Sequence, residues 1–368
     1  MKHLLPISLL LAAVVLIQQL TLWTDTQFYL TQLTMTGYYS LLIIGLCLLL
    51  GYAGQISLGH AGFFAIGGYT SAVLTTRDLT LHLEHPLLAA SDRLGLLMSR
   101  TDYFGGEIIH FHPWAAAVLA LAATMIIAYI IGVPVLKLKG HYLAMATLGF
   151  GIIIYRMVLA SPIFGEADGI FEVPAFPLVA GLSISGDFGS RVSNYYIAWG
   201  MVAITMLLLL NLINSRVGRG LRAIHGSEEA ANAMGINTAS YKLRTFILSA
   251  VLAALAGIFM THYSSGIGPN EAGVMQSVRY VAIVAVGGMA NLWGALTMGV
   301  GLNFMSLRGM FGTYDDAVFG VILITIMLFA PQGLLRLSLF NQLKDLLLPA
   351  ALKGWLGKPG KKKENGTA

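Results

Sequence analysis

The sequence predicts an all-α polytopic membrane protein with about ten transmembrane helices, some of them short or broken. Hydrophobic residues make up 57% of the 368 residues, whereas charged residues make up only 11%. Soluble domains carry about 25% charged residues, so a large soluble catalytic domain is excluded. Apolar runs of about 20 residues recur along the chain, which has room for roughly ten of them with their loops.

The expected helices are the apolar runs 4–23, 33–50, 56–76, 113–135, 142–160, 195–214, 243–263, 280–307 and 317–335. Run 280–307 is too long for one comfortable crossing and is interrupted by Gly287, Gly288, Asn291 and Gly294, so we expect two short helices there. Run 4–23 is expected to be a retained helix, because no small-x-small cleavage site follows its apolar core. The transmembrane domain would then cover residues 1–335.

Basic residues indicate the orientation of these helices. Lys and Arg are concentrated in the segment 216–244 and in the tail 336–368, and both are expected to be cytoplasmic by the positive-inside rule. Ten crossings satisfy this condition and place both termini in the cytoplasm. Segments 77–112 and 161–194 then form long, irregular and acidic external loops. The basic tail is expected to be disordered and either to contact anionic membrane lipids or to be merely solvated.

Charge within the predicted helices is scarce, which excludes several classes of protein. With Arg244 assigned to the cytoplasmic segment 216–244, Arg156 is the only charged residue inside a predicted span, where it can snorkel to the interface. The spans therefore lack the charged groups that a proton-coupled carrier needs. His60 and His262 are expected to be packing residues that form hydrogen bonds. No paired carboxylates or Ser/His arrangement suggests a catalytic site, and the single Cys47 offers neither a disulfide nor a metal site. The net charge of +5 is a topology signal, and we expect no binding to nucleic acid.

The segment 227–235 has the signals of a short helix. Ser227 is a good N-cap, Glu228 and Glu229 suit the first turn, and Gly235 suits the position after the helix. These signals predict a two-turn helix over 228–234. Its small residues Ala230, Ala231 and Ala233 would leave a thin rod that fits a groove on another protein. An ordinary solvated connector is the equally balanced alternative.

Glycines crowd the segment 51–68, at positions 51, 54, 59, 62, 67 and 68. One interpretation is tight helix packing, which small residues allow in membranes. The other is a broken helix that lines a translocation path, with Gln55, Ser57 and His60 as its polar groups. The interruption at 287–294 is the corresponding feature of the second half.

Several segments resemble one known family. Glu229-Ala-Ala-x-x-x-Gly235 resembles the core of the loop by which ABC-importer permeases dock onto their ATPase subunits, although the Ile-x-Leu-Pro portion of that motif is absent. The segments 51–69, 139–150, 215–224, 235–242 and 330–334 resemble, in the same order, permeases of the M type from branched-chain amino acid importers. The departures are the long segment 77–112 and Glu166-Ala-Asp-Gly-Ile, where Gly-Gly-x-x-Gly-Ile is more usual. Both are expected to be external.

The resemblance implies a permease of the type II ABC-importer kind in the bacterial inner (plasma) membrane. It implies transport of branched-chain or other hydrophobic amino acids, with Glu229, Ala230, Ala231 and Gly235 contacting the ATPase. The implied partners are a homologous second permease, two cytoplasmic ATP-binding subunits and an extracytoplasmic solute-binding protein. The chain has no Gly-x-x-x-x-Gly-Lys-Ser/Thr loop, so it is no enzyme itself, and ATP and Mg would bind to the partner subunits. A urea or short-chain amide permease, and a carrier or channel acting alone, are the alternatives.

Overall fold

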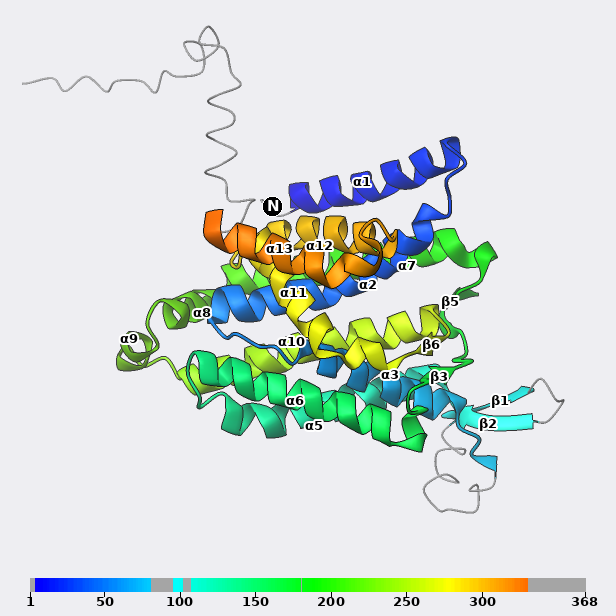
Figure 1. The fold of residues 1–368 in the computed structure, drawn as a ribbon, viewed down its shortest axis with the longest axis horizontal. Helices are drawn as coiled ribbons and strands as arrows, with labels where there is room; N and C mark the ends of the chain where they lie inside the picture. Colours follow the sequence, from blue (N-terminus) through cyan, green and yellow to red (C-terminus); the bar gives the residue numbers. More distant parts are fainter. Residues whose placement is uncertain (1–3, 81–94, 102–106, 180, 330–368) are drawn as a thin grey trace, which may run out of the picture.

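The computed structural model describes residues 4–80, 95–101, 107–179 and 181–329 (Figure 1). The predicted tail 336–368 lies outside the described residues, as does the end of the predicted run 317–335. The membrane-type helices of the described part are α1 (Leu4–Trp23), α2 (Tyr29–Cys47), α3 (His60–Thr76), α5 (Pro113–Val135), α6 (His141–Ala160), α7 (Arg191–Asn214), α10 (Thr238–Tyr263), α11 (Val274–Gly287), α12 (Leu292–Leu307) and α13 (Asp315–Phe329).

Within the described residues, 6 helices are long and apolar enough to cross a membrane. They are α1, α5, α6, α7, α10 and α2, which a π-helical turn extends to Tyr52. The helices α3, α11, α12 and α13 have 14 to 17 residues each. A polytopic, mainly helical protein is therefore confirmed, whereas the number of about ten crossings stays a prediction.

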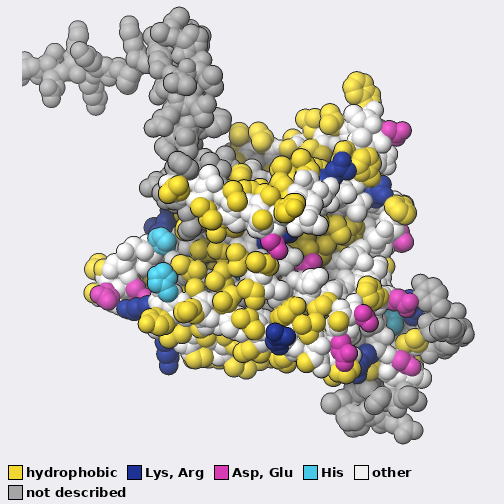
Figure 2. All heavy atoms as spheres, viewed as in Figure 1, with side chains coloured by type: hydrophobic (Ala, Val, Ile, Leu, Met, Phe, Trp, Pro, Cys, Tyr) yellow, Lys and Arg dark blue, Asp and Glu magenta, His cyan; other side chains and the backbone are white. Residues whose placement is uncertain are grey.

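The bundle has two distinct ends, which Figure 1 shows on the left and on the right. The short helices α8 (Arg216–Gly226) and α9 (Glu228–Ala233) form one end, here called the α9 end. Three two-stranded antiparallel sheets form the other, the strand end. Figure 2 shows hydrophobic side chains across the middle of the visible face and charged side chains gathered mainly at the two ends. This distribution fits a protein that spans a bilayer.

Five of the six short strands in the described part of the chain lie in the segments 77–112 and 161–194, which were predicted to be irregular, and β6 follows α10. In the first, β1 (Leu97–Thr101) pairs with β2 (Glu107–Phe111). In the second, β4 (Phe176–Val179) pairs with β5 (Leu182–Ile184), and β3 (Ile170–Phe171) pairs with β6 (Gly266–Ile267). The strand pairing supplies hydrogen bonds to backbone that sequence patterns alone left unassigned. The described parts of both segments lie at the end opposite to α8 and α9, and the external location of that end stays a prediction.

Helix α10 is central and packs against α2, α3 and α5. Small residues make its contact with α3. A Cβ atom added at Gly257 would lie 2.1 Å from the Phe64 carbonyl oxygen, and a Cβ atom added at Gly67 would lie 2.4 Å from the Ala254 carbonyl oxygen. Only glycine allows the two backbones to approach so closely. The packing interpretation is therefore confirmed for this part of the glycine-rich segment.

The same segment also contains a true helix break, since residues 54–59 are not helical and α3 begins at His60 rather than at residue 56. Gly54 has a φ of +66°, a conformation that favours glycine. The exposed backbone finds partners elsewhere: Leu58 N–H donates to Thr147 Oγ1 at 2.9 Å, and Gln55 N–H donates to the Leu49 carbonyl at 3.2 Å. A membrane protein must satisfy unwound backbone in this way.

The predicted interruption of run 280–307 is confirmed, because α11 ends at Gly287 and α12 begins at Leu292. This second break touches the first. A Cβ atom added at Gly51 would lie 1.4 Å from the Met289 carbonyl oxygen, and the Tyr52 hydroxyl donates to the Ala290 carbonyl at 2.8 Å. The two breaks thus form one contact that joins distant parts of the sequence.

Several predicted helix starts were wrong in ways that place charged residues inside helices, and two of these residues are basic side chains with acidic partners. Helix α11 begins at Val274 and includes Arg279, which pairs with Asp315 and Asp316 at 3.2 and 3.4 Å. Arg156 is therefore not the only charged residue within the apolar helices. Helix α10 begins at Thr238 and includes Lys242, whereas the sequence pattern placed its start at residue 243. In both cases a side chain elsewhere pairs with the charge, which hydrophobicity alone does not reveal.

The contact between the breaks gives a first prediction. We expect Gly51→Ala to destabilise the protein by about 3 kcal/mol or more, because its Cβ would overlap backbone that cannot easily move. Gly149→Ala in α6 is the matched control, since no described atom lies within 4 Å of its added Cβ. That change should be neutral or stabilising by up to about 1 kcal/mol. The measurement is thermal unfolding in detergent, and equal melting temperatures for the two variants would contradict the prediction.

Candidate functional site

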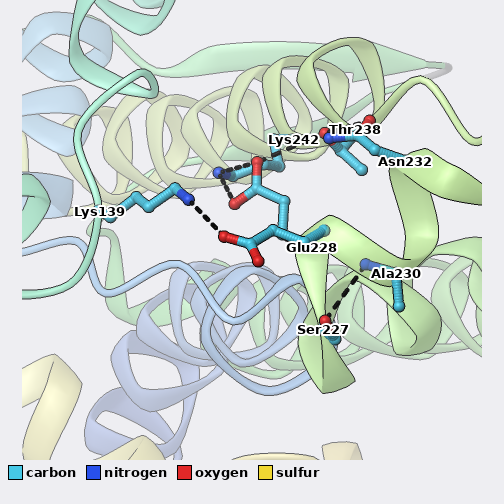
Figure 3. Close-up of polar contacts among 8 residues, drawn as sticks. Lys139, Ser227, Glu228, Ala230, Asn232, Thr238 and Lys242 are labelled. Carbon is cyan, nitrogen blue, oxygen red and sulfur yellow. Dashed lines mark hydrogen bonds and ion pairs between the residues drawn. The ribbon is translucent and has the colours of Figure 1, made fainter.

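The short helix α9 at the α9 end is built as its sequence predicts. The side chain of Ser227 accepts a hydrogen bond from Ala230 N–H at 3.3 Å, the arrangement of an N-cap (Figure 3). At its other end Gly235 has a φ of +82°, and Ile236 N–H donates to the Ala231 carbonyl at 3.1 Å. The Gly235 N–H in turn donates to the Asn232 carbonyl at 2.9 Å, which completes a Schellman motif. The chain direction on both sides of α9 is therefore fixed.

An ion pair holds α9 against the start of α10. Lys242 Nζ lies 2.9 and 3.0 Å from the two carboxylate oxygens of Glu228 (Figure 3). The Lys242 side chain is only 9% exposed, so its charge needs this partner. Thr238 adds a hydrogen bond to Asn232 at 3.1 Å. Helix α9 is thus anchored along one face and behaves as part of the bundle.

The opposite face of α9 is free among the described residues. Glu229 is exposed, and its contact with the exposed Lys139 at 3.5 Å is a weak surface pair. Ala230 and Gly235 are also exposed, and Met234 is 83% exposed, a large apolar side chain at the tip of the helix. This face offers a carboxylate beside an apolar side chain.

Ala231, which the resemblance places in the ATPase contact, does not lie on this free face. Ala231 is 3% exposed and faces the inside of this chain. The reason is helix geometry: with α9 anchored through Glu228 and Asn232, position 231 is turned toward the bundle, whereas 230 and 234 point away. Ala231 therefore supports the position of α9 and does not present a contact surface.

Helix α8 connects α9 to the helix breaks. Leu221 and Ile224 face inward, and the α8 backbone passes so close to α7 that a Cβ atom at Gly218 would lie 2.0 Å from the Ile213 carbonyl oxygen. At its end, His225 Nδ1 lies 2.8 Å from the Cβ position at Gly54, within the first break. Contacts therefore run from α9 through α8 to the break at 54–59.

A cavity of about 290 Å³ separates α9 from this break. Its lining includes Gln55, Lys139, His225, Glu228 and Lys242. Gln55 is 1% exposed, and neither atom of its side-chain amide has a hydrogen-bond partner within the described part of the chain. Buried amides are normally paired, so Gln55 is a free polar group at the wall of a polar cavity.

Ser57 and His60 were predicted to line a path together with Gln55. Unlike Gln55, both have hydrogen-bond partners for their side chains. His60 Nδ1 lies 3.0 Å from Ser57 Oγ, and His60 Nε2 lies 2.7 Å from Ser249 Oγ. All three side chains are buried, and this chain of hydrogen bonds joins the break to α10. His262 is similar, with contacts to Ser71 Oγ at 2.8 Å and to the Pro174 carbonyl at 2.7 Å, as expected for a packing histidine.

Two residues of the site were missed by sequence reasoning. The pairing of Lys242 with Glu228 bridges residues 14 apart in separate helices, so no local spacing rule could find it. Met234 carried a detectable signal, because an apolar residue directly before a helix-ending glycine is placed at the tip of the helix.

Comparisons with known proteins agree on one family. The family described as branched-chain amino acid transport system, permease component, matches residues 28–328. The permease protein LivM of Salmonella typhimurium is 28% identical over 83% of this chain and 69% of its own length, and LivM of Escherichia coli is 27% identical over the same shares. The permease protein LivH of Salmonella typhimurium is 25% identical over 82% of this chain and 92% of its own length. No solved structure matches the chain.

The match covers both helix breaks, the α8–α9 segment and the central helix α10. It therefore includes every element of the site described above, and the chain belongs to the branched-chain amino acid transport permease family.

Proposed function

We propose that this chain is a pore-forming subunit of an ABC importer for branched-chain or other hydrophobic amino acids in the bacterial inner membrane. The observation that carries the proposal is α9, a short helix anchored by Lys242 that presents Glu229 and Met234 at one end of an apolar bundle. Such a helix suits a groove on a partner protein. LivM and LivH are branched-chain amino acid transport permeases, and the likeness to them supports this substrate over urea or short-chain amides.

Two features of the chain's sequence support the proposed partners: it contains no phosphate-binding loop, and it resembles two different permeases. Its sequence contains no phosphate-binding loop, so two cytoplasmic ATP-binding subunits would hold ATP and Mg and drive transport. Its likeness to both LivM and LivH supports a second, homologous permease as the other half of the pore. An extracytoplasmic solute-binding protein would deliver the substrate at the strand end.

Movement of the ATPases would reach the membrane through contacts already described. Helix α9 is fixed to α10 by Lys242, and α8 touches the first break where His225 meets Gly54. The first break touches the second at Gly51 and Met289. A displacement of α9 would therefore shift both breaks together, because neither contact leaves room for independent movement.

We propose that Gln55, Ser57 and His60 lie at the translocation path, where Gln55 has a different role from the other two. Gln55 would offer its unpaired amide to a passing polar group. Ser57 and His60 would hold the shape of the break through their hydrogen bonds to each other and to Ser249.

The orientation can be tested by labelling single cysteines in a Cys47→Ala background. We expect the α9 end, with its basic residues, to be cytoplasmic and the strand end to be external. Gly189→Cys at the strand end should react with an impermeant maleimide in intact spheroplasts, whereas Gly226→Cys should react only after permeabilisation. No described atom lies within 4 Å of the added Cβ at either position, so both thiols should be accessible. Labelling of residue 226 in intact spheroplasts would overturn the proposed orientation.

The docking face gives a further prediction. Ala230→Arg places a bulky charge on the exposed face of α9, and we expect ATPase retention on purification to fall about tenfold, equivalent to about 1.4 kcal/mol. The permease should keep its melting temperature, because residue 230 is exposed. The matched control is Ala175→Arg, which adds the same charge at the strand end and should leave ATPase retention unchanged.

Ala231→Arg should behave differently from both variants. Because Ala231 is buried against its own chain, we expect this change to lower the melting temperature or to make the α8–α9 segment sensitive to protease. Wild-type ATPase retention and uptake in Ala230→Arg would remove the support that α9 gives to the ABC mechanism.

A further inference from the structure

A second cavity lies just inside the strand end, between α2, α3, α10 and the β3–β6 pair. Its volume is about 360 Å³, within the usual range of about 300 to 1,000 Å³ for small-molecule sites. Most of its wall is apolar and comes from Met35, Phe64, Phe171, Met260, Ile267 and Leu307. Its polar lining residues are Tyr39, Thr261, Ser264 and Glu271, with backbone of Gly266 and Gly268.

Glu271 is the charged group of this cavity. It lies in the short 3-10 turn Pro269–Ala272, which connects α10 to α11. The Tyr39 hydroxyl donates a hydrogen bond to Glu271 Oε1 at 3.0 Å. Its second oxygen, Oε2, is buried and has no hydrogen-bond partner in the part of the chain that the structure describes. A buried carboxylate oxygen without a donor is costly unless a ligand supplies one.

The nearest basic side chain is already engaged. Arg279 is bonded to Asp315 at 3.2 Å and to Asp316 at 3.4 Å, and its guanidinium carbon lies 4.6 Å from the centre of the Phe319 ring. Among the described residues Glu271 itself forms no ion pair. Burial raises the pKa of the Glu271 carboxyl, and the hydrogen bond from Tyr39 and the positive charge of Arg279 oppose this only in part. A cationic ligand would stabilise the charged form.

The surroundings select the kind of cation. A hydrated metal ion prefers six or more oxygen ligands, whereas this cavity is mostly apolar. Tyr39, which donates to the carboxylate, belongs to an aromatic cluster: its ring centre lies 5.8 Å from that of Phe64, another lining residue, and 6.1 Å from that of Tyr280. An alkylammonium group can donate to Glu271 and also contact ring faces. The carbon chain attached to it would then lie along the apolar wall.

The cavity also holds an unpaired donor. Thr261 is 1% exposed, and its hydroxyl has no hydrogen-bond partner among the residues described here. A hydroxyl can donate to a carboxylate. The cavity therefore offers an acceptor for a cation, at Glu271, and a donor for an anion, at Thr261. A zwitterionic amino acid with an aliphatic side chain matches all three features: the acid, the hydroxyl and the apolar wall.

We propose that Glu271 binds the ammonium group of an aliphatic amino acid in this cavity, with its side chain against Met260 and Ile267. The inference rests on the proposed function and adds to it a substrate subsite near the entrance of the path. It assigns recognition of the ammonium group to this permease as well as to the binding protein that delivers the substrate.

The test uses the complete importer in proteoliposomes, with its second permease, ATPases and binding protein, and measures uptake of L-leucine. Glu271→Gln preserves the shape of the side chain and removes its charge. We expect uptake to fall at least about tenfold, because hydrogen bonds to charged groups are stronger than those between neutral groups. ATPase stimulation by the loaded binding protein should persist, because assembly does not involve this cavity. Glu166→Gln, an exposed acid at the same end, is the matched control and should transport like the wild type.

Glu271→Asp provides a second variant in case Glu271→Gln is not recovered. It keeps the charge but withdraws it by one methylene, so we expect a raised KM for leucine with little change in kcat. An unchanged KM in this variant, or wild-type uptake in Glu271→Gln, would overturn the inference while leaving the proposed function intact.

Direct occupancy can be measured with L-photo-leucine, a diazirine analogue of leucine. Cross-links should appear in peptides containing Met260 or Ile267, should be competed by L-leucine, and should not be competed by 4-methylpentanoate, which lacks the ammonium group. Labelling elsewhere, or equal labelling of Glu271→Gln, counts against the cavity. If the wild-type importer neither takes up leucine nor is labelled, both the proposed function and this inference fail.

Discussion

The contact between the two helix breaks is the constraint on which the α9 end depends. Gly51 meets the Met289 carbonyl so closely that a side chain at this position is excluded. Tyr52 and Cys47 add hydrogen bonds to the Ala290 and Met289 carbonyls at 2.8 and 3.4 Å. These bonds satisfy backbone acceptors that a broken helix would otherwise leave exposed in an apolar setting. The ends of α2, α11 and α12 are thereby held together. Helix α8 contacts the same region, because His225 lies beside Gly54.

Buried polar groups in the bundle fall into two kinds with different consequences. His60 and His262 have partners on both ring nitrogens, so they fix the packing of neighbouring helices. Gln55 and Glu271 have side-chain atoms without partners among the described residues, and both line cavities. An unpaired buried polar group lowers stability, so its place at a cavity wall favours a role toward a ligand. The two kinds cannot be told apart in the sequence, where all four are polar residues in or beside apolar runs.

Local rules predicted local features well. Capping preferences predicted the helix at 228–234 with Ser227 before it and Gly235 after it. Glycine spacing predicted the interruption of run 280–307, but for the segment 51–68 it left a broken helix as one of two interpretations. Contacts over long sequence distances were not predictable in this way. The inward turn of Ala231 depends on the pairing of Glu228 with Lys242, and the setting of Glu271 depends on Tyr39, which is 232 residues away. The predicted start of α11 at residue 280 came too late, because the charge of Arg279 lowers the hydrophobicity at this point and its pairing with α13 is not visible in the sequence.

The two cavities also bear on where a solute could cross. One lies at the α9 end beside Gln55 and the other at the strand end beside Glu271, and between them along α10 lies its contact with α3. At Gly67 and Gly257 the two backbones touch without room for a side chain, so an amino acid cannot pass between these helices unless the core of the chain separates. Separation would break the small-residue packing around the central helix. A route along a surface shared with the second permease avoids this cost, because that surface can open without disturbing the interior of either subunit.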